Sequence, residues 1–239
     1  SDLQKLETAR TALARKNQLA ALGQMSASIT HELGQPISAM RNYLAAEEIA
    51  QNATPGSVLP ELSGLVARMQ GIVNQLRQFG QKTQNPGIPF VIQDTITAAQ
   101  QMVRHTAEAA NVRLTVDMPK ETVTLTGQPQ RFEQVIVNLL RNGIDAVSEQ
   151  PERLIALALT QDANDVKLTV SDTGPGLGDL DIADLREPFF STKPSGKGMG
   201  LGLAISGQIV NEMGGTLFAQ NGPTGGAVFT VTLAKDPHV

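Results

Sequence analysis

The first side chain with evident chemistry is the imidazole of His31, which directly precedes the carboxylate of Glu32. His31 is two positions from Ile29 and two from Leu33, so on a helix it points about 200° away from each and should face water. An exposed imidazole beside a carboxylate that keeps its other nitrogen protonated is a competent nucleophile near neutral pH. The residues alone also allow a plain solvated helix face, formed with Gln24, Ser28, Gln35, Ser38 and Asn42.

A second group of polar side chains lies in a helix that we predict over residues 128–149. The side chains of Asn and Asp compete for backbone hydrogen bonds and therefore destabilise a helix interior. Several of them on one face thus suggest a functional role. Mg²⁺ takes one or two protein oxygens and the rest from water and phosphate, so Asn142 beside a nucleotide would suffice. A solvated face is again the alternative. The aligned residues, at spacings of four, three and four, are Asn138, Asn142, Asp145 and Glu149.

Asp172 follows an alternating strand pattern over residues 166–171 and begins the sequence Asp-Thr-Gly-Pro-Gly. Its carboxylate is suited to accept a hydrogen bond from an exocyclic amino group. Gly174 and Gly176 lack side chains and would let a ring lie close to the backbone. The segment therefore indicates a ligand site at a strand end, although an ordinary glycine turn would have the same letters.

A glycine-rich segment, residues 196–203, directly precedes another predicted helix. Free amides and the positive dipole end at a helix start favour an anion such as phosphate, and Lys193 and Lys197 add positive charge. The Gly-Lys-Ser/Thr ending of a Walker loop is absent. A dinucleotide-binding fingerprint would belong in the first strand-helix turn of a parallel unit rather than here. A flexible loop remains the alternative.

The elements that must position these side chains are of two kinds. Over residues 3–81 apolar side chains repeat at three and four positions, which predicts helix, and the Pro- and Gly-containing segment 52–60 interrupts it. The two helices can pair as an antiparallel hairpin. Because two helices bury little core, we expect a second copy to complete a four-helix bundle.

Beyond a Pro- and Gly-rich linker at residues 84–89, helical and strand patterns alternate. Neighbouring strands with helices grouped between them indicate a mixed sheet covered by helices on one face, which makes the fold class α+β. The predicted helices are 94–110, 128–149 and 201–213, and the predicted strands are 112–116, 122–126, 154–160, 166–171, 216–219 and 227–233.

The composition excludes several classes of protein. The chain has 239 residues, of which 41% are hydrophobic and 18% are charged. This length and apolar content are sufficient for a folded hydrophobic core. Lys and Arg total 19 against 23 Asp and Glu, and aromatics are 3%, so we expect no nucleic-acid partner. The absence of cysteine excludes disulfides, thiolate metal sites and a Cys nucleophile. No apolar run approaches the roughly 18 residues of a membrane span, so we expect a soluble chain.

Five segments in this order resemble the sensor histidine kinases of two-component signalling. They match, in turn, the phospho-acceptor box, the N box, the first glycine box, the F box and the second glycine box of that family. The approach Leu-Gly-Gln-Met at 22–25 and the form His-Glu-Leu-x-Gln-Pro are most similar to the branch of dicarboxylate sensors. The five segments are 31–36 (His-Glu-Leu-Gly-Gln-Pro), 138–146 (Asn-Leu-Leu-Arg-Asn-Gly-Ile-Asp-Ala), 172–176 (Asp-Thr-Gly-Pro-Gly), 188–193 (Pro-Phe-Phe-Ser-Thr-Lys) and 198–203 (Gly-Met-Gly-Leu-Gly-Leu).

The resemblance implies that His31 receives the γ-phosphoryl group of ATP, with Glu32 as base, and passes it to an aspartate on a response-regulator receiver domain. It implies that Asn142 ligates Mg²⁺ and that Asn138 lines the same pocket. Asp172 would read the adenine amino group. Further residues would cradle the phosphates, neutralise their charge or line the site, some of them within a mobile lid at about 177–199: Asp145, Gly174, Gly176, Lys193, Gly198, Gly200, Leu201 and Gly202.

The resemblance also implies a domain order. Residues 1–20 would be a signalling helix or coiled coil, residues 21–84 the dimerisation and histidine phosphotransfer domain, and residues 89–239 an α/β sandwich ATP-binding domain of the GHKL or Bergerat type. We expect a homodimer that makes no direct membrane contact itself and forms the cytoplasmic part of an inner-membrane sensor. Gln35 stands four positions after His31, where many members have the Thr or Asn that serves dephosphorylation, so phosphatase activity is left open.

Two other functions compete with a histidine kinase. One is a hydrolytic ATPase of the same fold, but such enzymes resemble one another in having a glutamate one turn before the metal-binding asparagine. This chain has Asn138 there, and an amide cannot act as a general base. The other is a scaffold that binds nucleotide or a partner protein and transfers nothing.

Overall fold

The computed structural model describes residues 33–43, 62–66, 69, 71, 73, 87–180, 182–187, 190, 200–223 and 225–235. The chain divides into two compact units, the first formed by residues 1–82 with 192–199 and the second by residues 83–191 with 200–239. Each unit is described by itself below. Among the described helices, none combines the length and the apolarity that crossing a membrane requires.

The first unit is helical wherever it is described. Residues 33–43 and 62–66 are α-helix, and so are residues 69, 71 and 73, all within the two helices that the apolar pattern predicts. Several apolar side chains of the predicted stripes are exposed in the single chain, with Ile37 at 52%, Val66 at 45% and Val73 at 52%. About half of each of these three side chains is therefore accessible to solvent.

The second unit is built on a five-stranded mixed sheet. Its order is β2-β4-β5-β7-β6, and all neighbours are antiparallel except β2 and β4, which are parallel. This confirms the predicted mixed sheet and the α+β class. The strands are β2 (Arg113–Asp117), β4 (Leu154–Gln161), β5 (Asp165–Asp172), β6 (Thr216–Asn221) and β7 (Ala227–Ala234).

Alternation of apolar and polar residues explains the strands at the centre of the sheet. In β4 and β5 every second residue is buried, as in Ile155, Leu157 and Leu159 of β4. The turn between these two strands is closed by Asp162, whose Oδ1 accepts hydrogen bonds from the backbone N–H groups of Asn164 at 3.0 Å and Asp165 at 2.8 Å.

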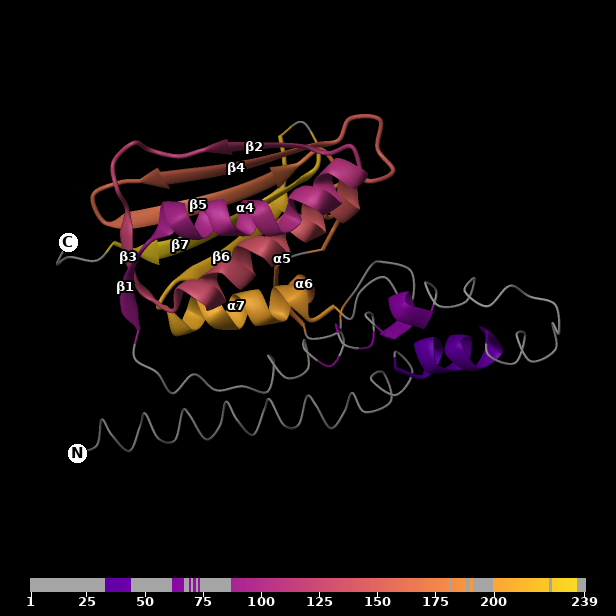
Figure 1. Cartoon of the computed structure of the whole chain (residues 1–239). Coiled ribbons are helices and arrows are strands. Elements are labelled where there is room, and N and C mark those ends of the chain that lie inside the picture. The colour runs from indigo at the N-terminus through magenta and orange to yellow at the C-terminus, as the bar shows by residue number, and fades with distance from the viewer. Residues whose placement is uncertain are drawn as a thin grey trace. The chain divides into compact units, whose positions relative to one another are not determined.

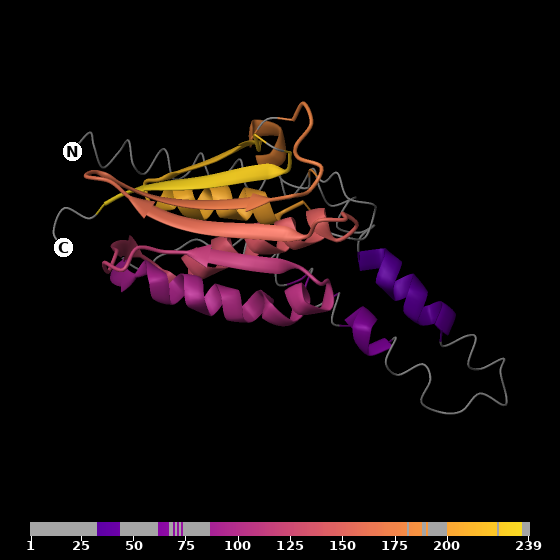
Figure 2. The ribbon, with the colours of Figure 1, turned by 90° about the horizontal axis from the view of Figure 1, so that it is seen from above.

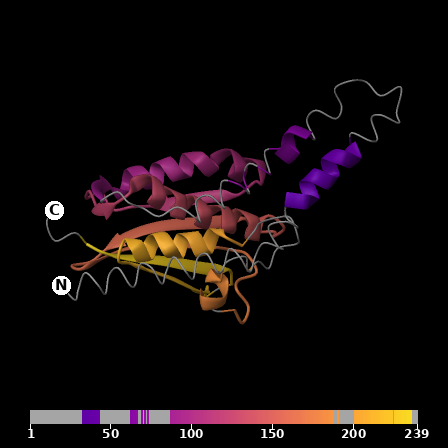
Figure 3. The ribbon, with the colours of Figure 1, turned by 90° about the horizontal axis from the view of Figure 1, so that it is seen from below.

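Three helices cover one face of the sheet: α4 (Ile92–Ala109), α5 (Pro129–Val147) and α7 (Gly202–Glu212) (Figure 1). They lie in front of the strands when the molecule is seen from below (Figure 3), whereas strands lie in front of α7 when it is seen from above (Figure 2). A short helix, α6 (Ile182–Arg186), follows the segment after β5. The buried residues of α5 recur on one side, because the helix is amphipathic, and they include Phe132, Ile136, Leu139 and Leu140.

The linker predicted over residues 84–89 includes residues that belong to a strand. Residues 84–89 have linker composition, but β1 (Ile88–Val91) pairs antiparallel with β3 (Thr124–Gly127). Phe90 of β1 is buried, and its ring centroid lies 6.1 Å from that of Phe132 on α5. This long-range pairing and packing outweigh the local preference of Pro and Gly for turns.

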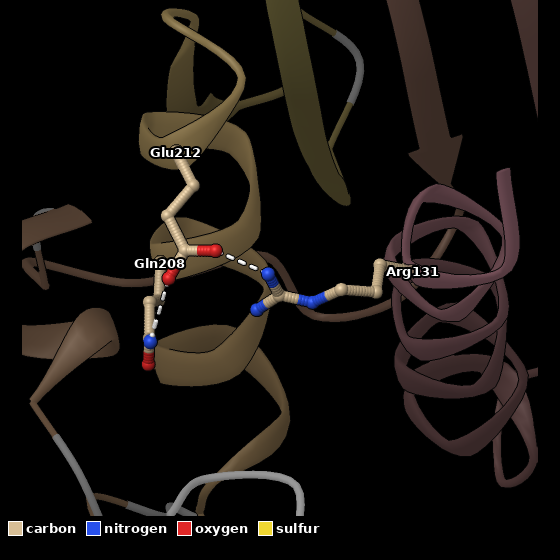
Figure 4. Close-up of polar contacts among 3 residues, drawn as sticks. All are labelled: Arg131, Gln208 and Glu212. Carbon is tan, nitrogen blue, oxygen red and sulfur yellow. Dashed lines mark hydrogen bonds and ion pairs between the residues drawn. The ribbon is translucent and has the colours of Figure 1, made fainter. Parts of the chain in front are cut away.

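A polar contact on the surface joins α5 to α7. Arg131, in the first turn of α5, makes an ion pair with Glu212, and Gln208 Nε2 donates a hydrogen bond to Glu212 Oε1 at 2.9 Å (Figure 4). Arg131 and Glu212 are partly exposed, so the contribution to stability is about 0.5 kcal/mol. The contact ties the start of α5 to the last turn of α7.

Candidate functional site

Asp172 is a buried carboxylate at the end of β5. Its Oδ1 accepts hydrogen bonds from the backbone N–H groups of Gly174 at 2.8 Å and Ala227 at 3.2 Å. Its Oδ2 has no hydrogen-bond partner among the residues that the structure describes. Burial raises the pKa of Asp172 above its ordinary value, and the two backbone amides offset only part of that rise. The residue is therefore held in place through one oxygen and can accept a donor through the other.

The glycines near Asp172 are needed because protein atoms crowd them. A Cβ atom on Gly174 would lie 2.8 Å from Asp172 Oδ1 and 2.9 Å from the Cβ of Ala146 on α5. A Cβ atom on Gly176, where φ is +81°, would lie 2.6 Å from Oδ1 of Asn221. The close packing of this loop against α5 and β6 thus gives a reason for both glycines that the sequence pattern could not reveal.

Gly226 is the most crowded glycine in this region. Its φ is +75°, and a Cβ atom there would lie 1.8 Å from the carbonyl oxygen of Asp172, whereas at neighbouring Gly225, with φ +97°, it would meet nothing within 4 Å. Both positions disfavour a side chain by backbone conformation, but only at Gly226 would an added side chain also push the start of β7 away from Asp172.

We expect Gly226→Ala to lower the free energy of unfolding by about 3 kcal/mol, since it adds a steric clash to backbone strain. Gly225→Ala, which has the strain without the clash, should lower it by about 1 kcal/mol. Urea unfolding followed by circular dichroism measures both values. Equal losses in the two variants would contradict the close approach of Gly226 to Asp172.

Two side chains that the sequence analysis did not single out fix the loop after β5. The Thr173 hydroxyl donates to the carbonyl of Glu152 at 2.8 Å and accepts from the N–H of Leu154 at 3.1 Å. Asn221 accepts from the N–H of Leu177 at 2.7 Å and donates to the carbonyl of Gly178 at 2.9 Å. Asn221 therefore holds the first residues of the predicted lid.

Helix α5 contributes three of the four predicted polar residues, Asn138, Asn142 and Asp145, whereas Glu149 lies in a turn beyond the last residue of the helix, Val147. Asn138 is half-buried and donates hydrogen bonds from Nδ2 to the Gly202 carbonyl at 3.2 Å and to Ser206 Oγ at 3.3 Å. Asn142 is half-buried and Asp145 is exposed. A Cβ atom on Gly143 would lie 3.7 Å from the Cβ of Asp172. Helix α5 therefore borders Asp172 through Gly143 and the start of α7 through Asn138.

The end of the second glycine-rich segment is also described. Gly200 has a φ of +64°, and Gly202 begins α7. The side chain of Leu201 is 1% exposed, so only its backbone is available to a ligand. His31, Glu32, Lys193 and Gly198 lie outside the described residues.

The polar atoms of the site are of the chemical types that ATP and Mg²⁺ require. Oδ2 of the buried residue Asp172, which lacks a hydrogen-bond partner among the described residues, suits the amino group of adenine. The amide oxygen of Asn142 is the hard type of ligand that Mg²⁺ accepts, and α5 places it one residue from Gly143, which borders Asp172. Gly202 begins a helix of 11 residues, whose first amides suit phosphate.

Two family descriptions match separate parts of the chain. Residues 21–85 match the His Kinase A (phospho-acceptor) domain, and residues 127–237 match the Histidine kinase-, DNA gyrase B-, and HSP90-like ATPase family. The first range contains His31 and Glu32, and the second contains α5, Asp172 and α7.

Curated relatives match almost the whole chain. It is 35% identical over 236 residues to a C4-dicarboxylate transport sensor protein, DctB, of Pseudomonas aeruginosa, and 32% identical over 238 residues to DctB of Rhizobium meliloti. These matches cover 96% and 97% of this chain but only 38% of each relative. The chain thus spans well under half the length of these relatives.

Solved structures with similar folds include the catalytic domain of the histidine kinase ThkA, with a TM-score of 0.55 and 26% identity over 63% of this chain and 99% of that one. The structure of ThkA in complex with the response regulator TrrA matches 99% of this chain and 68% of that one, with a TM-score of 0.77 and 22% identity. At that identity the second likeness shows the fold alone.

Proposed function

The chain belongs to the sensor histidine kinases of two-component signalling, and from this we propose that it transfers the γ-phosphoryl group of ATP to His31 and then to an aspartate of a response-regulator receiver domain. Both parts of such an enzyme are matched, the phospho-acceptor domain and the ATPase domain. Several relatives are dicarboxylate transport sensors, as the sequence predicted.

The observation that carries the proposal is the arrangement around Asp172. The carboxylate is oriented by two backbone amides, keeps one oxygen for a ligand and lies beside α5, the helix of Asn142. An acceptor oriented in this way can bind a purine amino group with little further loss of entropy, because the protein has already fixed the carboxylate on folding. The site thus supports an adenine nucleotide.

We propose these roles for the chain's own residues. Asp172 binds the adenine amino group, and Asn142, with Asn138 beside it, holds the cation end of the nucleotide. Backbone amides from the glycine-rich segment bind phosphate oxygens. Mg²⁺, when bound, would neutralise charge on the phosphates. The further residues proposed for the nucleotide site are Asp145, Gly174, Gly176, Lys193, Gly198, Gly200, Leu201 and Gly202.

In the transfer step, a ring nitrogen of His31 attacks the γ-phosphorus as the bond to the β,γ-bridging oxygen breaks, and ADP leaves. Glu32 accepts the proton from the imidazole, so the phosphorylated ring is left neutral. Transfer to the receiver aspartate then reverses the roles, with the carboxylate as nucleophile. Most of the acceleration comes from positioning and electrostatics, because the transition state has little covalent bonding for side chains to supply.

We further propose a homodimer formed through the helical hairpin and a position in the cytoplasmic part of an inner-membrane sensor. The dimer proposal is supported by the half-exposed Ile37, Val66 and Val73, which a second copy would cover. The position is supported by the likeness to transport sensor proteins.

A hydrolytic ATPase is disfavoured by Asn138. Its amide is no base, and both hydrogens of Nδ2 are used toward Gly202 and Ser206. Incubating the chain with γ-labelled ATP and Mg²⁺ distinguishes the functions. Acid-labile label on the protein, abolished by EDTA, supports the kinase. Steady phosphate release without labelled protein would support the ATPase, and neither product would support a scaffold.

A further inference from the structure

Ser206, in the second turn of α7, has a fully buried hydroxyl, at 0% exposure. Its Oγ donates a hydrogen bond to the Gly202 carbonyl at 2.8 Å and accepts one from Asn138 Nδ2 at 3.3 Å. Asn138 Nδ2 also donates to the Gly202 carbonyl at 3.2 Å. The three groups form a closed set of hydrogen bonds between α5 and the first turn of α7.

This set fixes which way the Asn138 amide faces. The Gly202 carbonyl can only accept, so the nitrogen of the amide must face it and the oxygen must face away. Both hydrogens of Nδ2 are then used, and Oδ1 has no hydrogen-bond partner within the described part of the chain. Asn138 therefore offers a ligand an acceptor and no donor.

The hydrogen bond from Ser206 to the carbonyl four residues earlier is common in helices and by itself indicates nothing further. The contact with Asn138 does, because it crosses to another helix at a buried point. Asn138 stands one turn before Asn142, and Gly202 is the last glycine of the segment that precedes α7. The hydroxyl thus links the metal-binding part of the proposed site to its phosphate-binding part.

We propose that Ser206 is a positioning residue for the nucleotide. By accepting from Asn138 and donating to Gly202, it keeps the Asn138 oxygen turned toward the bound nucleotide and its cation, and it keeps the first turn of α7 docked on α5. The inference rests on the proposed function in that it takes Mg²⁺·ATP as the ligand.

We expect Ser206→Ala to weaken binding of Mg²⁺ with the non-hydrolysable analogue adenylyl imidodiphosphate about tenfold, measured by isothermal titration calorimetry. The reason is that one N–H of the half-buried Asn138 loses its acceptor, so that only the hydrogen bond to the Gly202 carbonyl still holds the amide. If Ser206→Ala does not fold, Ser206→Cys keeps a similar volume with a weakly hydrogen-bonding thiol and should show the same direction. Unchanged affinity in the folded variant would overturn the inference.

A matched control is Arg131→Gln, which removes a different polar contact between α5 and α7, at the far end of α7 (Figure 4). It should alter analogue affinity less than twofold. A tenfold loss in this control too would mean that any loosening of α7 weakens binding, and the specific role of Ser206 would be wrong.

A double variant tests whether Ser206 acts through Asn138. Asn138→Ala with Ser206→Ala should bind the analogue within twofold of Asn138→Ala alone, because the hydroxyl then has no amide to orient. A further tenfold loss in the double variant would contradict the inference.

A readout without nucleotide is the side-chain amide of Asn138 in NMR spectra. Its protons should exchange slowly with solvent in the wild type and much faster in Ser206→Ala, and equal rates would count against the inference. The test is separable from the proposed function. A chain that binds the analogue but leaves His31 unlabelled refutes the kinase, whereas labelled His31 with unchanged affinity in Ser206→Ala refutes only the role of Ser206.

Discussion

The His31→Gln variant is expected to incorporate no phosphate from γ-labelled ATP, a complete loss against the wild type. A carboxamide has no basic nitrogen that could attack phosphorus, so the acceptor itself is removed. Because the sequence predicts that the imidazole faces water, an amide of similar length should leave the helical packing unchanged. Acid-labile label retained on the protein in a filter-binding assay measures the reaction. The affinity of the variant for adenylyl imidodiphosphate should equal that of the wild type.

His105 provides a matched control for this prediction. It is an exposed imidazole on α4, and its Nδ1 lies 3.8 Å from a carboxylate oxygen of Glu108, so it shares two of the features that make His31 a candidate nucleophile. His105→Gln should label as fast as the wild type. If label persisted in His31→Gln and disappeared in His105→Gln, the acceptor would be His105 on α4 and the assignment of His31 would be wrong.

The quaternary structure of His31→Gln gives a second check. The variant should sediment as a dimer in analytical ultracentrifugation, since the replaced side chain is not expected to pack within the bundle. A monomer in both the variant and the wild type would contradict the proposed homodimer but not the assignment of His31 as the acceptor. A monomer in the variant alone would show that His31 is packed inside the bundle, contrary to the predicted exposure.

The elements with strong periodicity could be predicted closely from the sequence. Helix α5 was expected over 128–149 and spans Pro129–Val147, and β5 was expected over 166–171 and spans Asp165–Asp172. In both, burial follows the apolar pattern, because the pattern itself records which face meets the core. β1 escaped prediction because its pairing with β3 and the packing of Phe90 are set by residues more than thirty positions away.

Residues of the candidate site could be predicted only where the type of side chain itself suggests a chemical role. Asp172 and Asn142 stood out because acidic and amide groups are unusual at a buried strand end and in mid-helix. Ser206 and Asn221 did not, because their roles come from partners 68 and 44 positions distant. An ordinary Ser in an apolar helix leaves no signal of such a partner.

Asp172→Asn is expected to weaken binding of Mg²⁺·ATP on the order of 100-fold while the fold is kept. The new amide oxygen still accepts from the N–H groups of Gly174 and Ala227, which now hold Oδ1 at 2.8 and 3.2 Å. That leaves the amide NH₂ where Oδ2 was, so two donors face each other when adenine enters. Isothermal titration calorimetry of the nucleotide and urea unfolding measure the two effects separately.

The same reversal predicts a change of base preference. Inosine triphosphate has a carbonyl oxygen where ATP has the amino group, so the variant should lose the preference for ATP, whereas the wild type should favour ATP. As a control, Asp165→Asn, at the opposite end of β5, should alter neither affinity nor preference. A variant that still prefers ATP would mean that Asp172 does not contact the base.

The raised pKa of Asp172 sets the pH dependence of both properties. A carboxyl whose pKa is higher in the folded chain than in the unfolded one binds its proton more tightly when folded, so its ionisation above that pKa opposes folding. Replacing it by a neutral amide should therefore leave the free energy of unfolding at pH 7 unchanged or higher. Wild-type affinity for ATP should fall as the pH is lowered through the raised pKa, because the protonated oxygen becomes a donor. The residual affinity of Asp172→Asn should lack that dependence, and an identical pH profile in the two proteins would assign the titration to another group.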